Sequence, residues 1–289
     1  MTYDSLLVVK TTEDHVAWTE ITRRQHDRSA LRYASDSTDE EWEIIGPFLA
    51  RASTVGRPSI HSMRAIWDGI QYQATAGCQW RMLPKDFPPF TTVQYHFYRW
   101  RDSGLLFVIN EALVAASRIT EGRDAPPTAA IIDSQSVKTT ESGGPAGYDA
   151  GKKIKGRKRH IVTDTLGNLL DAMVHTADIQ DRDGAPAVIE SVRDSYPSLA
   201  KLFADGGYAG VKLQTAVAHI ESLAIEIVKR SDSAAGFVVL PKRWIVERTF
   251  AWLNRCRRLA KDWEATIASS EAWLLIASIR RTVRFVART

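Results

Sequence analysis

The sequence has little cysteine, no Cys/His cluster and no long hydrophobic run. Its two cysteines, Cys78 and Cys256, lie far apart without a CxxC pair, which argues against a structural zinc site or a disulfide scaffold. No apolar run approaches the roughly 18 residues that span a bilayer. The apolar stretch 6–9 is shorter than the core of a signal peptide, which has about 7–15 residues. We therefore expect a cytoplasmic protein with no membrane partner.

The chain also lacks a strong net charge, although its basic residues cluster. The formal net charge is +4 over 289 residues, yet the run 152–160, KKIKGRKRH, holds six Lys or Arg residues and no acid. Residues 242–289 hold eleven Lys or Arg residues against four Asp or Glu residues. Basic clusters of this kind indicate a polyanionic partner, most simply nucleic acid. For any single run, a solvated face is the alternative.

Residues 36–122 show the patterns of several short helices. A capping box, in which Glu41 follows Thr38 by three residues, predicts the start of the first helix. Residues 1–35 show no clear period and mix charges with Ser and Thr, so we expect them to form an N-terminal arm.

The stretch 92–102 is an expected polar and aromatic helix, capped by Thr91 or Thr92, after the breaker-rich loop 83–89. A tight loop before such a helix is compatible with a helix-turn-helix module. The alternative is a small helical bundle, and we expect Trp42, Phe97 and Trp100 to lie in a core. The candidates for DNA contact on this helix are Gln94, Tyr95, Tyr98, Arg99 and Arg101.

A stretch rich in Pro, Gly and charge at 120–130 separates this segment from residues 123–289. Beyond it the pattern changes to three strands in a row, followed by alternating helices and strands. This order predicts an α/β fold with a mixed sheet flanked by helices. The first expected strands are 129–132, 157–165 and 169–177, and the last expected helices include a long one at 241–264.

Two of the expected strands end in a carboxylate. Asp133 follows the apolar run 129–132, and Asp205 follows Phe203 and Ala204 and precedes two glycines. Such glycines let the backbone approach a bulky ligand closely, and sites in open α/β sheets form at strand ends. One aspartate of this kind is equally compatible with an ordinary turn, but two of them indicate a shared site.

A third carboxylate, Glu247, lies in the expected long helix, one turn after Arg243. Taken alone, this pair indicates an ordinary ion pair on a helix surface. Taken with Asp133 and Asp205, it completes a set of oxygen ligands of the kind that suits Mg²⁺. Two such ions activate the attacking oxygen and stabilise the leaving oxygen in phosphodiester displacement.

Three long stretches carry a resemblance to a known family: IIDSQSVKTTESGG…GYDAGKKIKGRKRHIVTDTLGNLL, FADGGYAG and RWIVERTFAWLNRCRRLAKDWEATIAS. Over nearly all of its length beyond the N-terminal arm, the chain resembles the DDE transposases of small bacterial insertion sequences, in the group of insertion-sequence-four and insertion-sequence-five elements. The resemblance implies an RNase H-like catalytic domain at 123–289 and an all-α, helix-turn-helix-like DNA-binding domain at 36–122. It also implies that Asp133, Asp205 and Glu247 are catalytic and bind two ions, Mg²⁺ or Mn²⁺.

The sequence departs from this family at two positions near the last carboxylate. Many members carry the pattern Tyr-x2-Arg-x3-Glu-x6-Lys. Here Arg243 and Glu247 fit, but Leu240 stands in place of the Tyr and Asn254 in place of the Lys. The phosphate contacts of those two residues are expected to come instead from Arg255, Arg258 or Lys261, or to be absent.

The resemblance implies a transposase that binds terminal inverted repeats, cleaves the phosphodiester at the element ends and transfers the 3′ ends into target DNA. We expect a homodimer on double-stranded DNA, associated with the nucleoid. The alternatives are a catalytically inactive DNA-binding protein derived from a transposase, and a nuclease that cuts without joining. The expected DNA contacts are Lys152, Lys153, Lys155, Arg157, Lys158, Arg159, Arg243, Arg255, Arg258 and Lys261, together with Gln94, Arg99 and Arg101.

Overall fold

The computed structural model describes residues 19–50, 60–141, 143–228 and 242–289. The chain packs as two units, Met1–Ala34 and Ser35–Thr289. The described part of the first unit contains the short helix α1 (Glu20–His26), whose first turn is capped by the side chain of Thr19. The first half of the expected N-terminal arm lies outside the described residues.

A helical region precedes the sheet in the second unit. Its first helix, α2 (Asp39–Leu49), begins with the predicted capping box, in which Thr38 and Glu41 each accept the other's backbone N–H. The next helix, α3 (Met63–Ala76), ends at Gly77, as predicted, with a left-handed φ of 67°. The remaining elements of this region are η1 (Trp80–Met82), α4 (Phe90–Asp102) and α5 (Leu105–Thr120).

The start of α4 differs from the prediction. The backbone N–H groups of Thr92 and Val93 donate to the carbonyl of Pro89, so the helix begins at Phe90 without a threonine cap. The sharp turn lies after α4, where Gly104 has a φ of 71°. No single described helix is long and apolar enough to cross a membrane. Together, α4 and α5 pass the same test of length and composition, but they are bent by 72°.

A six-stranded mixed sheet forms the centre of the second unit. Its strands are β1 (Ala129–Lys138), β2 (Gly147–Asp149), β3 (Ile154–Asp164), β4 (Leu169–Thr176), β5 (Lys201–Ala204) and β6 (Ala224–Ile227). The order is β2-β3-β1-β5-β6, with β4 also paired to β3. The pairs β1–β3, β2–β3 and β3–β4 are antiparallel, while β1–β5 and β5–β6 are parallel. The predicted hairpin of β3 and β4 and the predicted mixed sheet are confirmed.

β1 is longer than predicted, so Asp133 lies within the strand and not at its end. The strand stays paired with β3 as far as Lys138, which lies opposite Gly156. Its polar half remains in the sheet because side chains such as Ser136 find hydrogen-bond partners; Ser136 Oγ donates to Asp149 Oδ2 at 2.6 Å. An apolar run therefore marked only the first half of this strand.

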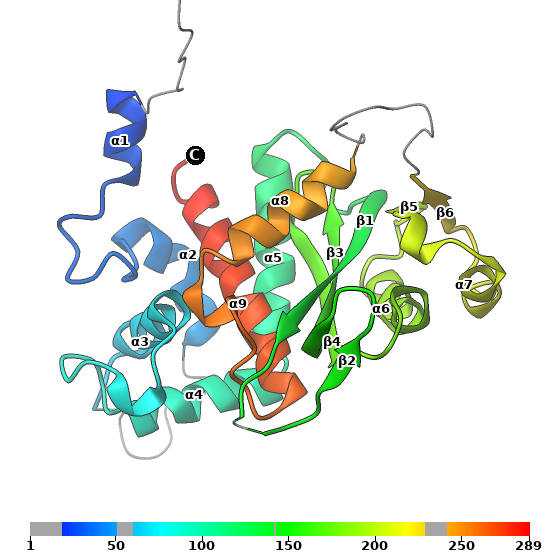
Figure 1. Cartoon of the computed structure of the whole chain (residues 1–289). Helices are drawn as coiled ribbons and strands as arrows, with labels where there is room; N and C mark the ends of the chain where they lie inside the picture. Colours follow the sequence, from blue (N-terminus) through cyan, green and yellow to red (C-terminus); the bar gives the residue numbers. More distant parts are fainter. Residues whose placement is uncertain (1–18, 51–59, 142, 229–241) are drawn as a thin grey trace, which may run out of the picture. The chain divides into compact units, whose positions relative to one another are not determined.

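Helices lie on both sides of the sheet, with α6 (Asp181–Ser195) on one side and α8 (Arg243–Leu253) and α9 (Ile267–Val286) on the other (Figure 1). The short elements η2 (Gly206–Tyr208) and α7 (Val211–Ala216) follow β5. Val188, Ile189 and Val192 of α6 are buried against apolar residues of β1, β3 and β4. This arrangement confirms the predicted α/β fold class, an RNase H-like mixed sheet between helices that follows a helical region.

The predicted long helix at 241–264 is wrong, because the chain turns after Leu253. A 3₁₀ turn, η3 (Arg257–Leu259), follows α8, and Cys256 before it is extended. The turn directs backbone carbonyls toward the sheet, where Arg159 Nη1 donates to Leu259 O at 2.8 Å. Hydrogen bonds from the buried Arg159 thus replace backbone hydrogen bonds that a continuous helix would make after Leu253.

The helical region packs against the last helix of the chain. Phe97 is fully buried and stacks on Trp273 of α9, with ring centroids 4.6 Å apart. Trp100 is also buried, as predicted, whereas Trp42 is half-buried. Asn110 of α5 accepts a hydrogen bond from Ser278 Oγ at 2.7 Å. Residues 35–289 thus pack as one unit. The division near residue 122 between a DNA-binding segment and a catalytic segment stays a prediction about function.

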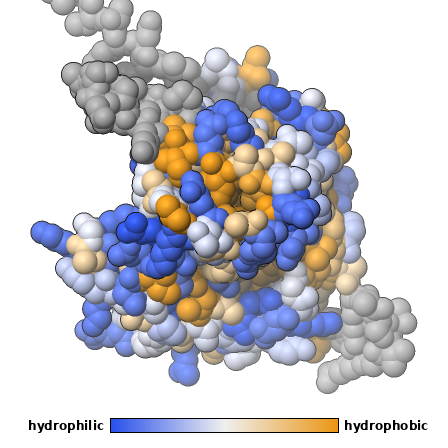
Figure 2. Space-filling view, turned by 90° about the vertical axis from the view of Figure 1, so that its right-hand side faces the viewer, coloured by the Kyte–Doolittle hydropathy of each residue, from blue (hydrophilic) through white to orange (hydrophobic). Residues whose placement is uncertain are grey.

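The surface on the side of β6 and α7 is largely hydrophilic. In that view hydrophobic residues gather near the middle, with hydrophilic residues around them (Figure 2). Val211 of α7 is 75% exposed. Asp133 of the candidate site lies within β1, and Asp205 comes directly after β5, the parallel neighbour of β1.

Candidate active site

The sheet brings Asp133 and Asp205 to the same place. β1 and β5 are parallel neighbours, and Ile131 lies opposite Phe203. Each aspartate comes two residues later, so both lie on the same side of the sheet as those two residues, because side chains alternate along a strand. The register therefore supports the predicted meeting of Asp133, within β1, and Asp205, directly after β5.

Arg243 connects Glu247 of α8 to Asp205. Arg243 Nη2 lies 3.4 Å from Asp205 Oδ2, and Arg243 Nε lies 3.2 Å from Glu247 Oε1. An ordinary helix-surface pair would involve Arg243 and Glu247 alone. The added contact with Asp205 shows that Arg243 links the helix carboxylate to the strand carboxylates.

Burial gives the Asp133 carboxyl an unusual affinity for its proton. The pKa of Asp133 is raised to about 6, chiefly by burial and also by the nearby charge of Asp205, while the Ser134 backbone N–H, Arg243 and Lys152 oppose the rise. A buried carboxyl beside a second carboxylate is a position where bound positive charge is strongly favoured. Asp133 and Asp205 therefore form the electrostatic centre of the site.

The donor chemistry of these residues fits Mg²⁺ or Mn²⁺, which prefer carboxylate oxygens. In the ranges that the structure describes, no three His, Cys, Asp or Glu side chains are arranged to hold a metal ion as they stand. The guanidinium of Arg243 contacts both Asp205 and Glu247. A bound ion would take over the carboxylate oxygens that Arg243 now contacts.

The two glycines after Asp205 have different surroundings. The Gly207 N–H donates to Asp205 Oδ1 at 2.8 Å. A Cβ added at Gly207 would lie 3.0 Å from that same oxygen, whereas a Cβ at Gly206 would meet nothing within 4 Å. Of the two glycines, only Gly207 is crowded, by the Asp205 carboxylate, and the close approach of a ligand to this turn stays a prediction.

The basic run 152–160 divides into an exposed half and a buried half. Lys152, Lys153 and Lys155 are exposed at the start of β3. The next three basic residues are buried, and each binds groups inside the protein: Arg157 pairs with Asp262, Lys158 with Asp181, and Arg159 with the carbonyl of Leu259. The expectation that these three contact phosphate is corrected, because their charged groups face the interior.

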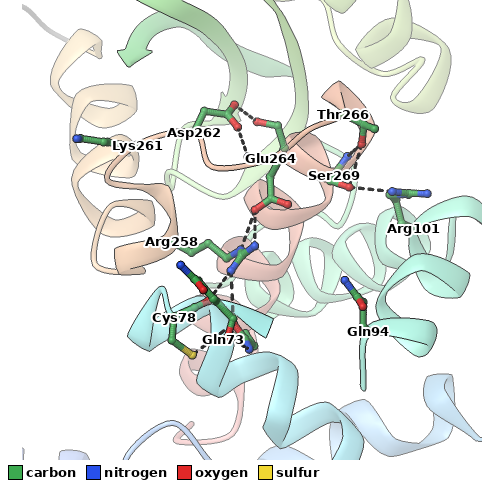
Figure 3. A network of polar contacts seen from close by, with 12 residues as sticks. Gln73, Cys78, Gln94, Arg101, Arg258, Lys261, Asp262, Glu264, Thr266 and Ser269 are labelled. Carbon is green, nitrogen blue, oxygen red and sulfur yellow. Dashed lines mark hydrogen bonds and ion pairs between the residues drawn. The ribbon is translucent and has the colours of Figure 1, made fainter. Parts of the chain in front are cut away.

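The basic residues after α8 divide in the same way. Arg258 is buried and pairs with Glu264 at 2.6 Å, and it also donates to the carbonyl of Cys78 at 2.9 Å. Figure 3 shows Arg258 pointing into this network while Lys261 points away from it. Arg255 and Lys261 are exposed. The expected phosphate contact of Arg258 is therefore also corrected, since this side chain ties η3 to the end of α3.

The candidate residues of α4 have three different surroundings. Arg99 is exposed. Gln94 Nε2 donates to the Tyr98 hydroxyl at 3.1 Å. Arg101 pairs with Asp102 at 2.7 Å and donates to Ser269 Oγ at 2.8 Å, as Figure 3 shows for Ser269. Arg99 is thus the most accessible of the three predicted contacts.

Sequence reasoning missed a polar layer beneath the site. Asp181 Oδ1 accepts hydrogen bonds from Ser134 Oγ at 2.8 Å and from Lys158 Nζ at 2.7 Å. The Tyr208 hydroxyl lies 3.3 Å from His160 Nδ1. The alternation of side chains along β3 was the available signal, because every second residue of a basic strand must face the other side of the sheet. No pattern in the sequence singled out Asp181.

Two family models match the chain. One, described as "Transposase DDE domain", matches residues 124–280, and the other, "Putative transposase of IS4/5 family", matches residues 38–110. The first match includes all three candidate carboxylates, and the second covers α2 to α4. Together they span most of the second unit.

Two curated proteins are similar over part of the chain. "Putative transposase for insertion sequence element IS402" of Burkholderia cepacia is 30% identical over 115 residues, 36% of this chain and 52% of the relative. "Uncharacterized protein y4sN" of Sinorhizobium fredii is 29% identical over 80 residues, 28% of this chain and 62% of the relative. The matches thus span 52% and 62% of these relatives' lengths. No solved structure matches. With a model match from residue 124 to residue 280, the chain belongs to the family defined by the transposase DDE domain.

Proposed function

We propose that this protein is a metal-dependent DNA transposase that cuts the phosphodiester at the ends of an insertion sequence and transfers the 3′ ends into target DNA. The observation that carries the proposal is the convergence of Asp133 and Asp205 on adjacent parallel strands with Glu247 of α8, joined through Arg243. Three carboxylates from two neighbouring strands and a helix can bind divalent ions, and the family of this chain generally uses such ions.

Asp133, Asp205 and Glu247 would hold Mg²⁺ or Mn²⁺, as two ions. Bound there, the ions would lower the pKa of an attacking water or hydroxyl and stabilise the leaving oxygen. Asp133 must be ionised to act as a ligand, and its raised pKa means that protons compete with the metal near pH 6. Arg243 Nε makes an ion pair but no hydrogen bond among the described residues. This nitrogen is buried, but the Arg243 side chain as a whole is 38% exposed, so its exposed part would contact a DNA phosphate.

The exposed basic residues near the site supply the contacts to the DNA backbone. Of these residues, Lys152 lies near Asp133, since Lys152 Nζ is 3.4 Å from the carbonyl of Ser134. Contacts of this kind give affinity without sequence information. The proposed backbone contacts are Lys152, Lys153, Lys155, Arg243, Arg255 and Lys261.

Recognition of the terminal inverted repeats is proposed to lie mainly in residues 36–122, with Arg99 and Gln94 of α4 facing DNA. Hydrogen bonds to base edges carry sequence information that phosphate contacts lack. Because α5 packs on α9, this division is best tested in the full chain. Arg99→Ala should reduce the preference for the terminal repeat over random DNA. Holding two ends in one complex favours a homodimer, and a cytoplasmic, nucleoid-associated location follows from the proposed substrate.

The decisive experiment uses terminal-repeat DNA that is already cut, so that a 3′-OH is present. A transposase joins this end to a target plasmid in the presence of Mg²⁺. A protein that cleaves uncut ends but never joins pre-cut ends is a nuclease. A protein that binds the ends and neither cuts nor joins is an inactive DNA-binding protein, in spite of its three carboxylates.

A further inference from the structure

Ser134, the residue after Asp133, points to the opposite face of the sheet from Asp133. In the antiparallel register of β1 and β3, Asp133 lies opposite Ile161 and Ser134 lies opposite His160. Side chains alternate between the two faces of a sheet. Ser134 therefore lies on the α6 side, beneath the catalytic face, and it is buried there.

Asp181, the first residue of α6, binds Ser134 in this layer. Asp181 Oδ1 accepts from Ser134 Oγ at 2.8 Å and from Lys158 Nζ at 2.7 Å. Lys158 is 4% exposed, and it also donates to the carbonyl of Ile179 at 2.7 Å. Lys158 is thereby held between β3 and the start of α6. The Asp181 carboxylate is thus fixed by a buried cation, and it in turn fixes the strand residue that follows Asp133.

The same carboxylate lies against the turn that carries Asp205. A Cβ added at Gly207 would lie 3.6 Å from Asp181 Oδ2, the oxygen that does not bind Ser134. The next residue, Tyr208, is 1% exposed and places its hydroxyl 3.3 Å from His160 Nδ1. Asp181 therefore contacts both Ser134, which follows Asp133, and the turn at Gly207, which follows Asp205.

We propose that Asp181 is a positioning residue that sets the separation of Asp133 and Asp205, and so the affinity of the site for metal. The inference rests on the proposed function, because the separation matters for metal only if the two carboxylates share it. Groups that orient metal ligands without binding the metal typically change metal affinity or activity by about 10–100-fold when mutated. Asp181 would act in a similar way, without binding the ion itself, through its contacts with Ser134 and Gly207.

Direct metal binding to the full chain without DNA tests this inference. The electron paramagnetic resonance signal of free Mn²⁺ gives the dissociation constant for wild type, Asp181→Asn and Asp183→Asn. Asp183 is the matched control, since it lies in the same helical turn and pairs with Lys212 at 2.7 Å, away from Ser134. We expect Asp181→Asn to weaken Mn²⁺ binding about 10-fold or more, and Asp183→Asn to change it by less than about 2-fold.

A purely structural role for Asp181 would give a different result. In that case urea unfolding in EDTA would show lost stability, while the dissociation constant for Mn²⁺ below the unfolding transition would stay at the wild-type value. Ser134→Ala provides a second variant that keeps the Lys158–Asp181 pair and should weaken Mn²⁺ binding in the same direction. In cleavage assays, added Mg²⁺ should restore much of the Asp181→Asn rate.

The outcomes separate this inference from the proposed function. If Asp133→Asn loses Mn²⁺ binding while Asp181→Asn and Ser134→Ala bind as wild type does, the metal site stands and the role of Asp181 is overturned. If Asp133→Asn binds Mn²⁺ as wild type does, the proposed metal site fails, and the role of Asp181 fails with it.

Discussion

The guanidinium of Arg243 lies 3.4 Å from Asp205 Oδ2 and connects α8 to the residue that follows β5. The same side chain contacts Glu247 one turn later on α8. One cation thus offsets part of the repulsion between carboxylates that come from different elements. In the proposed mechanism, metal ions take over these oxygens, and Arg243 becomes available to a phosphate.

The turn after Asp205 gives a prediction with a built-in control. Gly207→Ala places a methyl group 3.0 Å from Asp205 Oδ1, so the carboxylate or the turn must shift. Gly206→Ala adds the same methyl group one residue earlier, where nothing lies within 4 Å. We expect cleavage to fall about 10- to 100-fold in Gly207→Ala, because small misplacements of catalytic groups are costly, and to stay near wild type in Gly206→Ala. Equal rates for the two variants would show that the position of Asp205 does not limit cleavage.

The raised pKa of Asp133 predicts how stability depends on pH in the metal-free protein. Its pKa rises from 3.8 to about 6 on folding, so its contribution to stability is fully present below about pH 3.8 and is lost as the pH rises through 6. The loss amounts to about 3 kcal/mol at 1.36 kcal/mol per pKa unit. Asp133→Asn lacks this titration. Relative to wild type, the variant should therefore gain about 3 kcal/mol between pH 4 and pH 8.

Urea unfolding in EDTA at several pH values measures this difference. EDTA removes metal ions, which would stabilise the wild type alone and hide the effect. A difference between Asp133→Asn and wild type that stays constant from pH 4 to pH 8 would contradict the assigned burial of the Asp133 carboxyl.

Substitutions in the buried half of the basic run should lower the free energy of unfolding without removing phosphate contacts. Arg157 and Asp262 are both fully buried and lie 3.0 Å apart. Arg157→Met leaves the Asp262 charge without this partner, and breaking such a pair typically costs about 3–5 kcal/mol. The control is Lys155→Met, two residues earlier and exposed, which should change the free energy of unfolding by less than about 0.5 kcal/mol. Urea unfolding of both variants checks the contrast, which would vanish if Arg157 faced solvent.

The exposed half of the run predicts the salt dependence of DNA binding. Each phosphate contact contributes roughly −0.9 to the slope of log affinity against log salt. Replacing Lys152, Lys153 and Lys155 with Gln should therefore flatten the slope by about 0.9 for each phosphate that these lysines neutralise. Lys212→Gln is a control, because Lys212 lies outside this run in the sequence and pairs with Asp183. An unchanged slope in the triple variant would identify the run as a solvated face.

The sequence was sufficient to predict the sheet class and the β3–β4 hairpin, while the roles of the candidate site residues stay predictions. The apolar runs before Asp133 and Asp205 located β5 and the first half of β1, and the pairing of these strands brings the two aspartates near each other. The extent of β1 could not be predicted in this way, because Ser136 and its neighbours remain in the strand through hydrogen bonds to residues far along the chain. Polar residues with buried partners look like loop residues in a sequence.

The same limit explains the errors in the basic segments. Arg157, Lys158, Arg159 and Arg258 have the composition of a DNA-binding surface, yet the structure buries all four. Their partners, such as Asp262 and Glu264, are acids that single-sequence patterns do not pair with them. The break after α8 has the same origin, since the carbonyl of Leu259 is used by Arg159 and not by a helix. Local sequence propensity does not predict a hydrogen bond between segments that are far apart in the sequence.

Cleavage of terminal-repeat DNA by the three single carboxylate variants tests the central claim most directly. Asp133→Asn, Asp205→Asn and Glu247→Gln should each abolish cleavage in Mg²⁺ while leaving DNA binding nearly intact. The double variants should resemble the singles, because groups that act as a unit are not additive. A variant that cuts at the wild-type rate would remove its residue from the site, and wild-type cutting by all three would contradict catalysis at these carboxylates.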